Sequence, residues 1–137
     1  MNKVISPKYV AHTRARKANY QIWFRLSFGR MVRVVRLLLY VWINKSHVNE
    51  VFSVKVGMNE PADGNDTEDD VKKARYCAND VSQYPGETDD KGITTKKDIY
   101  CYGPLEGRVV YLNKYTKTAA GSDLLAFDEV IVFGEKM

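Results

Sequence analysis

Hydrophobic and polar residues alternate along several short stretches of the chain, which is the pattern of half-buried β-strands. The clearest example is residues 20–29, which end at a glycine. The apolar residues of one face are Ile22, Phe24, Leu26 and Phe28. The other face is polar apart from Trp23. We therefore predict a strand with one buried face, and with Trp23 on its outer face.

Residues 30–43, RMVRVVRLLLYVWI, fit two patterns. An arginine at every third position is typical of a basic amphipathic helix, whereas the Val, Leu, Tyr and Trp content favours a strand. We predict a strand, because turn-like residues 44–49 follow it and an alternating stretch begins at residue 50. Residues 30–43 and 50–57 are then expected to form a hairpin.

The rest of the chain continues as short strands separated by turns. Residues 58–75 carry Pro, Gly and a dense acidic run, which predicts a solvated loop rather than a metal site, since the spacing does not fit a calcium loop. Further strands are expected near residues 76–77 and in TTKKDIYCY, GRVVYLNKY and LLAFDEVIVFG. The fold class predicted is all-β, an antiparallel β-sandwich or jelly roll.

Length and charge divide the chain further. Its 137 residues suit one domain, which we place at residues 19–137 behind a basic N-terminal arm at residues 1–18. Residues 1–49 hold ten Lys or Arg and no acid, whereas residues 50–100 hold twelve acids and seven bases. The basic part is expected to fold back against the acidic loops.

An alternative use of the basic part is binding to nucleic acid or to an anionic membrane surface. Without aromatic residues interleaved in a known binding motif, this interpretation is not preferred, and no nucleic-acid partner is expected. Its candidate residues would be Arg14, Arg16, Lys17, Arg30, Arg33 and Arg36.

No catalytic constellation is evident. The sequence has no nucleophile elbow, phosphate-binding glycine loop, HExxH or CxxC, and both histidines fall in predicted loops, so enzymatic activity is not expected. The longest apolar run, residues 37–43, is too short to span a bilayer, and the N-terminus lacks the apolar run of a signal peptide. Cys77 and Cys101 are open to two interpretations, one disulfide or two buried thiols.

Five segments read together resemble the successive strand motifs of the F-type lectin (fucolectin) domain. They are WFRLSFGRMVRVVRLLLY, FSVKVGMN, YCAND, IYCYGPLEGRVVYLNKY and LLAFDEVIVFG. The resemblance covers about residues 10–134, and its two C-terminal motifs are the most specific. It implies a galactose-binding-like jelly roll, usually secreted, that binds fucosylated glycans or glycoproteins and often holds a structural calcium ion. It also implies a disulfide between Cys77 and Cys101.

The resemblance also suggests where a sugar would bind. The family uses one histidine and two basic side chains as donors to the sugar. His12 lies near the position of the histidine, but the two arginine positions fall near Trp42 and near residues 48–49. Lys45 and His47 are close enough in sequence to replace the missing donors, and Trp42 can stack on a sugar ring. The sugar site is therefore predicted to be altered or degenerate.

For calcium, Glu129 matches the ligand-bearing glutamate of the closing strand, and Asp128 replaces the cysteine beside it. The remaining ligands come from a part of the family domain that precedes the matched residues. A jelly roll without that part exposes a sheet edge, unless the basic arm covers it or the chain is a fragment. Location outside the cell is implied by the resemblance alone.

The preferred interpretation is a non-catalytic carbohydrate-binding domain with a degenerate sugar site. The first alternative is a structural or protein-interaction sandwich that has lost sugar binding, which the missing arginines support. The second is the basic binder of nucleic acid or anionic membranes described above.

Overall fold

The computed structural model describes residues 3–5, 8–12, 21–43, 51–60, 68–82, 93–115 and 127–137. These residues form seven strands, all paired antiparallel, and one short helix. The prediction of an antiparallel all-β fold is confirmed. In chain order the elements are β1 Lys3–Ile5, β2 Lys8–His12, β3 Gln21–Ile43, β4 Val51–Gly57, α1 Glu68–Lys73, β5 Arg75–Ser82, β6 Ile93–Tyr115 and β7 Phe127–Lys136.

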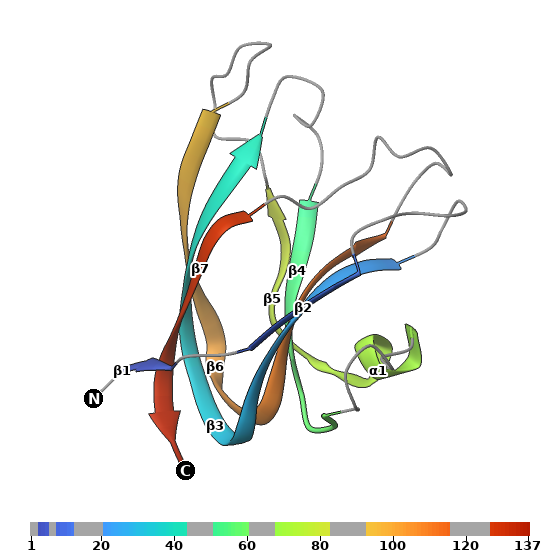
Figure 1. The fold of residues 1–137 in the computed structure, drawn as a ribbon, viewed down its shortest axis with the longest axis vertical. Coiled ribbons are helices and arrows are strands. Elements are labelled where there is room, and N and C mark those ends of the chain that lie inside the picture. The colour runs from blue at the N-terminus through green and yellow to red at the C-terminus, as the bar shows by residue number, and fades with distance from the viewer. Residues whose placement is uncertain are drawn as a thin grey trace.

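Two long strands, β3 and β6, run side by side and bend back together (Figure 1). The strand order is β1-β7-β3-β6-β4-β5, with β2 also paired to β3. Residues 21–27 of β3 pair with the second half of β6, and residues 32–43 pair with its first half and with β7. The first layer therefore contains β2, β4, β5 and one half of each long strand. The second contains β1, β7 and the other halves, and the two layers form a sandwich.

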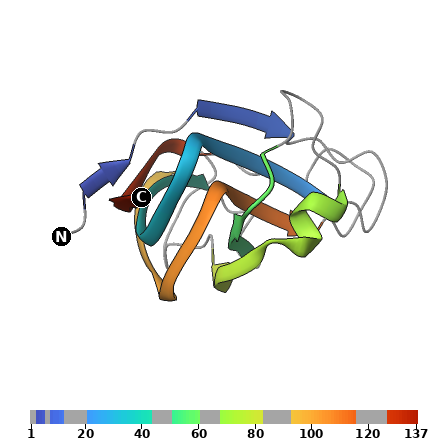
Figure 2. The ribbon, with the colours of Figure 1, turned by 90° about the horizontal axis from the view of Figure 1, so that it is seen from below.

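The bends lie where the sequence suggested strand ends. Residues 28–31 of β3 lie between the Ser27–Val109 and Val32–Gly107 pairs, and Gly29 has a φ of 72°, which glycine adopts without steric cost. In β6, residues 101–104 lie opposite Val35 alone, as a bulge. Extra residues in one strand increase twist and bend the strand. Seen from the bend, β3 and β6 are two adjacent V-shaped strands (Figure 2).

The main core lies between the two layers. Alternation within each half-strand sends one set of side chains inward, as the sequence predicted. Fully buried members include Leu26, Val34, Leu37, Leu39, Phe52, Val54, Val110, Leu112 and Val132.

A second, smaller core lies on the outer face of the first layer. Trp23 is 3% exposed there and packs with Val71, Ala74, Val109 and Tyr111. The sequence pattern correctly predicted that Trp23 lies on the outer face of its strand. It did not predict which residues cover Trp23 there. That cover comes from α1, so residues 58–75 are not wholly the predicted loop.

The predicted hairpin between residues 30–43 and 50–57 is wrong. The second half of β3 is already flanked by β6 and β7, and β4 pairs with β5 and β6 instead. β3 therefore ends in the second layer, and β4 belongs to the first.

Residues 1–18, read from sequence as an arm or loop, contain β1 and β2. Polar side chains interrupt the alternation there, so the pattern does not predict a strand, yet β1 pairs with β7 and β2 pairs with β3. Both strands lie at edges of the sheet. From sequence, an exposed edge was expected unless the N-terminal arm covered it. The division at residue 18 stays a prediction.

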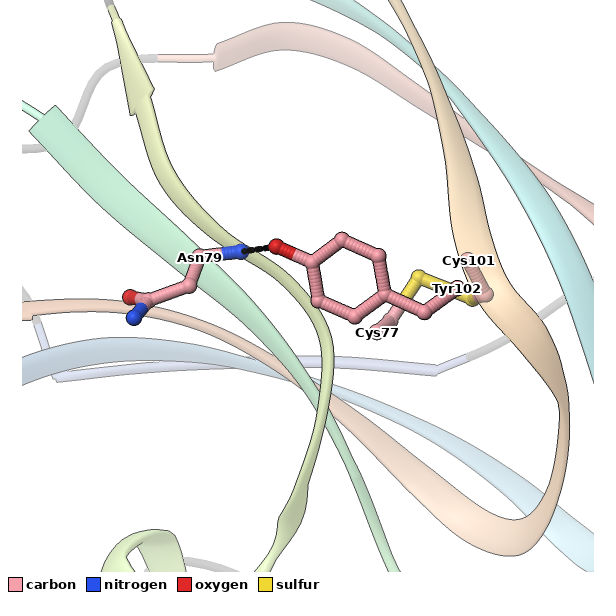
Figure 3. The surroundings of a disulfide bond; sticks show 4 residues. All are labelled: Cys77, Asn79, Cys101 and Tyr102. Carbon is pink, nitrogen blue, oxygen red and sulfur yellow. Dashed lines mark hydrogen bonds between the residues drawn. A yellow bond between two sulfur atoms is a disulfide. The ribbon is translucent and has the colours of Figure 1, made fainter.

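A disulfide joins Cys77 of β5 to Cys101 of β6, with a Cα to Cα distance of 4.2 Å. This confirms the bond that the family resemblance implied and excludes two buried thiols. The first layer ends at β5, and the second ends at the first half of β6, so the bond ties the two layers together at their edges. Beside it, the hydroxyl of Tyr102 accepts a hydrogen bond from the backbone N–H of Asn79 at 3.2 Å (Figure 3).

Candidate functional site

The bent strands carry two of the predicted sugar-site positions, His12 and Trp42, away from the bend. His12 ends β2 and pairs with Trp23 near the start of β3, whereas Trp42 lies near the end of β3, opposite Thr94. Because β3 folds back on itself, these two positions lie in different layers and both point away from the bend (Figure 1). We call this the loop end.

The side chains of the four predicted sugar-site residues are not among those that the structure describes. For His12 and Trp42 only the strand positions are given. Lys45 and His47 lie outside the described residues altogether. Their assignment to a sugar site stays a prediction.

Two arginines of β3, Arg33 and Arg36, belong to the second layer and pair with acidic side chains. Arg36 donates two hydrogen bonds to the carboxylate of Asp98, at 2.6 and 2.9 Å. Its guanidinium also lies over the rings of Tyr100 and Phe133, at 5.3 and 4.8 Å from the centroids. The hydrogen bond to Asp98 raises the pKa of Arg36 and lowers that of Asp98.

Arg33 is engaged in the same way. It donates to Glu106 of β6 at 3.0 Å and to Glu135 of β7 at 3.2 Å, which raises its pKa. Arg30 donates to the backbone oxygen of Met137 at 3.4 Å. Arg33 and Arg36 thus pair with acids of neighbouring strands, whereas the acidic loops were the partners expected from sequence.

This pairing weakens the interpretation of β3 as a basic surface for nucleic acid, because a phosphate would have to displace the carboxylates of Asp98, Glu106 and Glu135. The other candidates for that role, Arg14, Arg16 and Lys17, lie outside the described residues.

The predicted calcium ligands lie on β7. Glu129 is exposed and pairs in register with Tyr40 of β3. The side chain of Asp128 is not described. Within the described ranges, no three His, Cys, Asp or Glu side chains gather as a metal site. Two carboxylates do not make the six or more oxygens that calcium requires, so calcium binding stays a prediction.

A feature that the sequence analysis missed lies at the opposite end, beside the bend. One hollow of about 420 Å³ is lined by Arg33, Met58, Arg75, Pro104 and Glu106. A second, of about 390 Å³, shares Met58 and Arg75 with the first and adds Val56, Asn59, Asp70, Lys73 and Ala74. We call the two together the bend-end groove. No local pattern predicts it, because its residues come from β3, β4, α1, β5, β6 and the segment after β4.

Comparison with known proteins gives similarity in structure only. No family model matches the chain, and no curated protein matches it in sequence. The structure of a fucolectin from striped bass serum matches with a TM-score of 0.60 and 16% identity, over 87% of this chain. The fold is a galactose-binding-like jelly roll, similar to that of F-type lectins.

Two carbohydrate-binding modules have the same fold along nearly the whole chain. A chitosan-binding module of a Paenibacillus chitosanase/glucanase matches with a TM-score of 0.53 and 14% identity, covering 98% of this chain and 94% of the module. A family 32 module of C. perfringens NanJ, solved with galactose, matches with a TM-score of 0.56 and 9% identity, covering 97% and 99%. The present chain spans about a third, 34%, of the striped bass fucolectin. Among the described residues, no helix is long and apolar enough to cross a membrane.

Proposed function

We propose that this chain is a non-catalytic carbohydrate-binding domain whose sugar site lies at the loop end. The observation that carries the proposal is the jelly-roll fold, which is similar to a fucolectin, a chitosan-binding module and a module solved with galactose. The bend in β3 supports the proposal as well. The start of β3, which pairs with His12, and the end of β3, which holds Trp42, both lie away from the bend.

The chemistry of the four candidate residues suits a sugar. A neutral sugar needs several fixed hydrogen-bond donors and an apolar surface against its C–H face. His12, Lys45 and His47 supply donors, and Trp42 supplies the apolar face. We propose fucosylated glycans or glycoproteins as the ligands. Because arginine donors are missing at the expected positions, the site is an altered version of the family's.

The disulfide supports a location outside the cell. Disulfides persist in oxidising compartments and are rare in the cytosol, and the Cys77–Cys101 bond ties the two layers together. We therefore propose that the domain works in an extracellular setting, where glycans are displayed.

Calcium at Asp128 and Glu129 is kept as a separate hypothesis. Bound calcium would stabilise the native state by mass action, so thermal unfolding would shift upward with added calcium and downward with EDTA. An unchanged midpoint across a calcium titration would reject the hypothesis and leave sugar binding unaffected.

The test of the proposed function is a calorimetric titration with L-fucose, fucosylated oligosaccharides and galactose. We expect saturable binding that weakens about tenfold or more, roughly 1.4 kcal/mol, in Trp42→Ala, and that also weakens in His12→Ala. Tyr102→Ala is the matched control, since it removes an exposed aromatic ring of β6 that lies between the Arg36–Tyr100 and Val34–Leu105 pairs, away from the loop end. If folded protein binds none of these sugars at millimolar concentration, the first alternative is correct. The chain is then a structural or protein-interaction domain that has lost sugar binding.

A further inference from the structure

The bend-end groove combines charge with apolar surface. Its charged lining residues are Arg33, Asp70, Lys73, Arg75 and Glu106. Its apolar lining includes Met58, which faces both hollows and is 55% exposed. Each hollow falls within the volume range of small-molecule sites. The groove is therefore large enough for about one sugar ring in each hollow.

The acids of the groove already have partners. Glu106 accepts a hydrogen bond from Arg33 at 3.0 Å, and Asp70 accepts one from the side-chain amide of Asn59 at 3.1 Å. Lys73 and Arg75 are exposed, and within the described parts of the chain no ion pair joins either of them to a carboxylate. The amide of Asn59 does not neutralise the Asp70 carboxylate. Beside the paired Arg33 and Glu106, the lining therefore holds one negative charge, Asp70, and two positive charges, Lys73 and Arg75, which leaves a net charge of +1. Arg75 lines both hollows, and Lys73 lines the second.

The position of Arg75 is fixed by the surrounding fold. Its guanidinium donates to the backbone oxygen of Glu106, and the disulfide at Cys77 anchors the same strand two residues later. On the other side, the backbone N–H of Gly29 at the bend donates to the carboxylate of Glu60 at 3.2 Å, which holds the segment after β4. Donors fixed before binding lose less entropy when a ligand arrives.

We propose that the bend-end groove is a second saccharide site, and that it binds an anionic sugar through a carboxylate or a sulfate ester. The anionic group would lie between Lys73 and Arg75, where charge-assisted hydrogen bonds are available. The C–H face of the ring would lie on Met58, whose flexible side chain adapts to irregular apolar surfaces. The proposal takes saccharides as ligands from the proposed function, but it uses none of the loop-end residues.

The test uses trigalacturonate, its neutral counterpart galactotriose, and a galactose 6-sulfate disaccharide. We expect trigalacturonate or the sulfated sugar to bind, and galactotriose to bind at least tenfold more weakly to this groove. Binding of only one of the two anionic probes identifies the group that is read. The affinity is expected to fall as salt rises, because the cations are exposed.

Two variants locate the site. Arg75→Gln and Lys73→Gln should each weaken the anionic probe about three- to tenfold, since each removes one charge-assisted hydrogen bond at an exposed position, where water and salt screen the charge. Lys72→Gln is the matched control, because Lys72 is an exposed cation of the same helix that does not line either hollow. Met58→Glu tests the apolar contact by placing a like charge beside the ligand, and it should abolish binding.

The outcomes separate the two sites. Anionic binding that is unchanged in Trp42→Ala and weakened in Arg75→Gln supports the groove, even if no neutral sugar binds at the loop end. Anionic binding lost in Trp42→Ala, or weakened equally by Lys72→Gln and Arg75→Gln, rejects the groove and leaves the loop-end proposal standing. Absence of binding by every anionic probe to folded protein also rejects it.

Discussion

Gly134 of β7 lies where strands β1, β3 and β7 come together. A Cβ at this position would overlap the backbone oxygen of Arg33 and lie 3.0 Å from a side-chain carbon of Ile5. The sequence pattern predicted only that this glycine ends the last strand. In the structure it lies within β7, where it permits the close approach of β3.

Gly134→Ala is therefore expected to lower the free energy of unfolding by about 1–3 kcal/mol or more, as overpacking of a filled site does. Gly103→Ala is the control, because no atom lies within 4 Å of a Cβ there. Its effect should stay within about 0.5 kcal/mol. Urea unfolding measures both, and equal stability of the two variants would contradict the close packing described for Gly134.

The Arg36–Asp98 pair predicts how the protein responds to acid. The hydrogen bond from Arg36 lowers the pKa of Asp98 in the folded state. A carboxyl group with a depressed folded pKa contributes stability above its unfolded pKa, and that contribution is lost as pH falls through the folded value. Asp98→Asn should therefore be less stable than wild type at neutral pH, with the difference shrinking below about pH 4.

Asp69→Asn provides the comparison for Asp98→Asn. Asp69 is an exposed carboxylate of α1, and no arginine partner is recorded for it among the described residues. The stability of Asp69→Asn is measured at the same pH values, so that the loss of an exposed carboxylate is separated from the loss of the Arg36 pair. A difference between Asp98→Asn and wild type that persists undiminished to pH 2 would show that the ion pair does not account for the effect.

At the scale of elements, the two long strands and the disulfide hold the layers together. The sequence read β3 and β6 as four strands, because Gly29 and the Gly103–Pro104 pair are ordinary signals for a strand end. The pairing of β3 with β6 continues past both bends, so these residues bend strands instead of ending them. A local turn signal alone does not distinguish a break from a bend, because the difference lies in the partner strand.

Removing the disulfide with Cys77→Ala and Cys101→Ala together should lower the free energy of unfolding by about 3–4 kcal/mol in the chain-entropy model, for a sequence separation of 24 residues. Denaturant unfolding of the double variant, without reductant, measures this loss. The oxidised wild type treated with reductant should approach the same value. A loss below about 1 kcal/mol would mean that packing alone holds β5 against β6.

At the scale of the whole molecule, the folding-back of β3 creates two distinct ends. The loop end carries the positions of His12 and Trp42, and the bend end carries the groove with Arg75. Because the core separates them, we expect the two sites to act independently. Both sites would then be occupied at the same time, which raises the avidity of the domain for a glycan surface that displays both kinds of sugar.

Independence of the two ends can be measured with a double-mutant cycle. Trp42→Ala with Arg75→Gln should weaken the neutral probe by the same factor as Trp42→Ala alone, and the anionic probe by the same factor as Arg75→Gln alone. Effects at distant sites without shared partners add within about 0.5 kcal/mol. A coupling energy well above that would contradict two independent sites and would indicate one continuous binding surface.

The sequence by itself determined the strand content after residue 18, the inward-facing side chains such as Leu26 and Val54, and the jelly-roll resemblance, because alternation is a local property of each strand. The disulfide followed from the resemblance rather than from spacing. Only the tertiary structure decided that β4 joins β5 and β6 and that α1 covers Trp23. It also decided that Arg33 and Arg36 meet acids of β6 and β7. These depend on contacts between segments that are distant in the chain. The bend-end groove likewise depends on the tertiary structure, since its lining residues come from six separate segments of the chain.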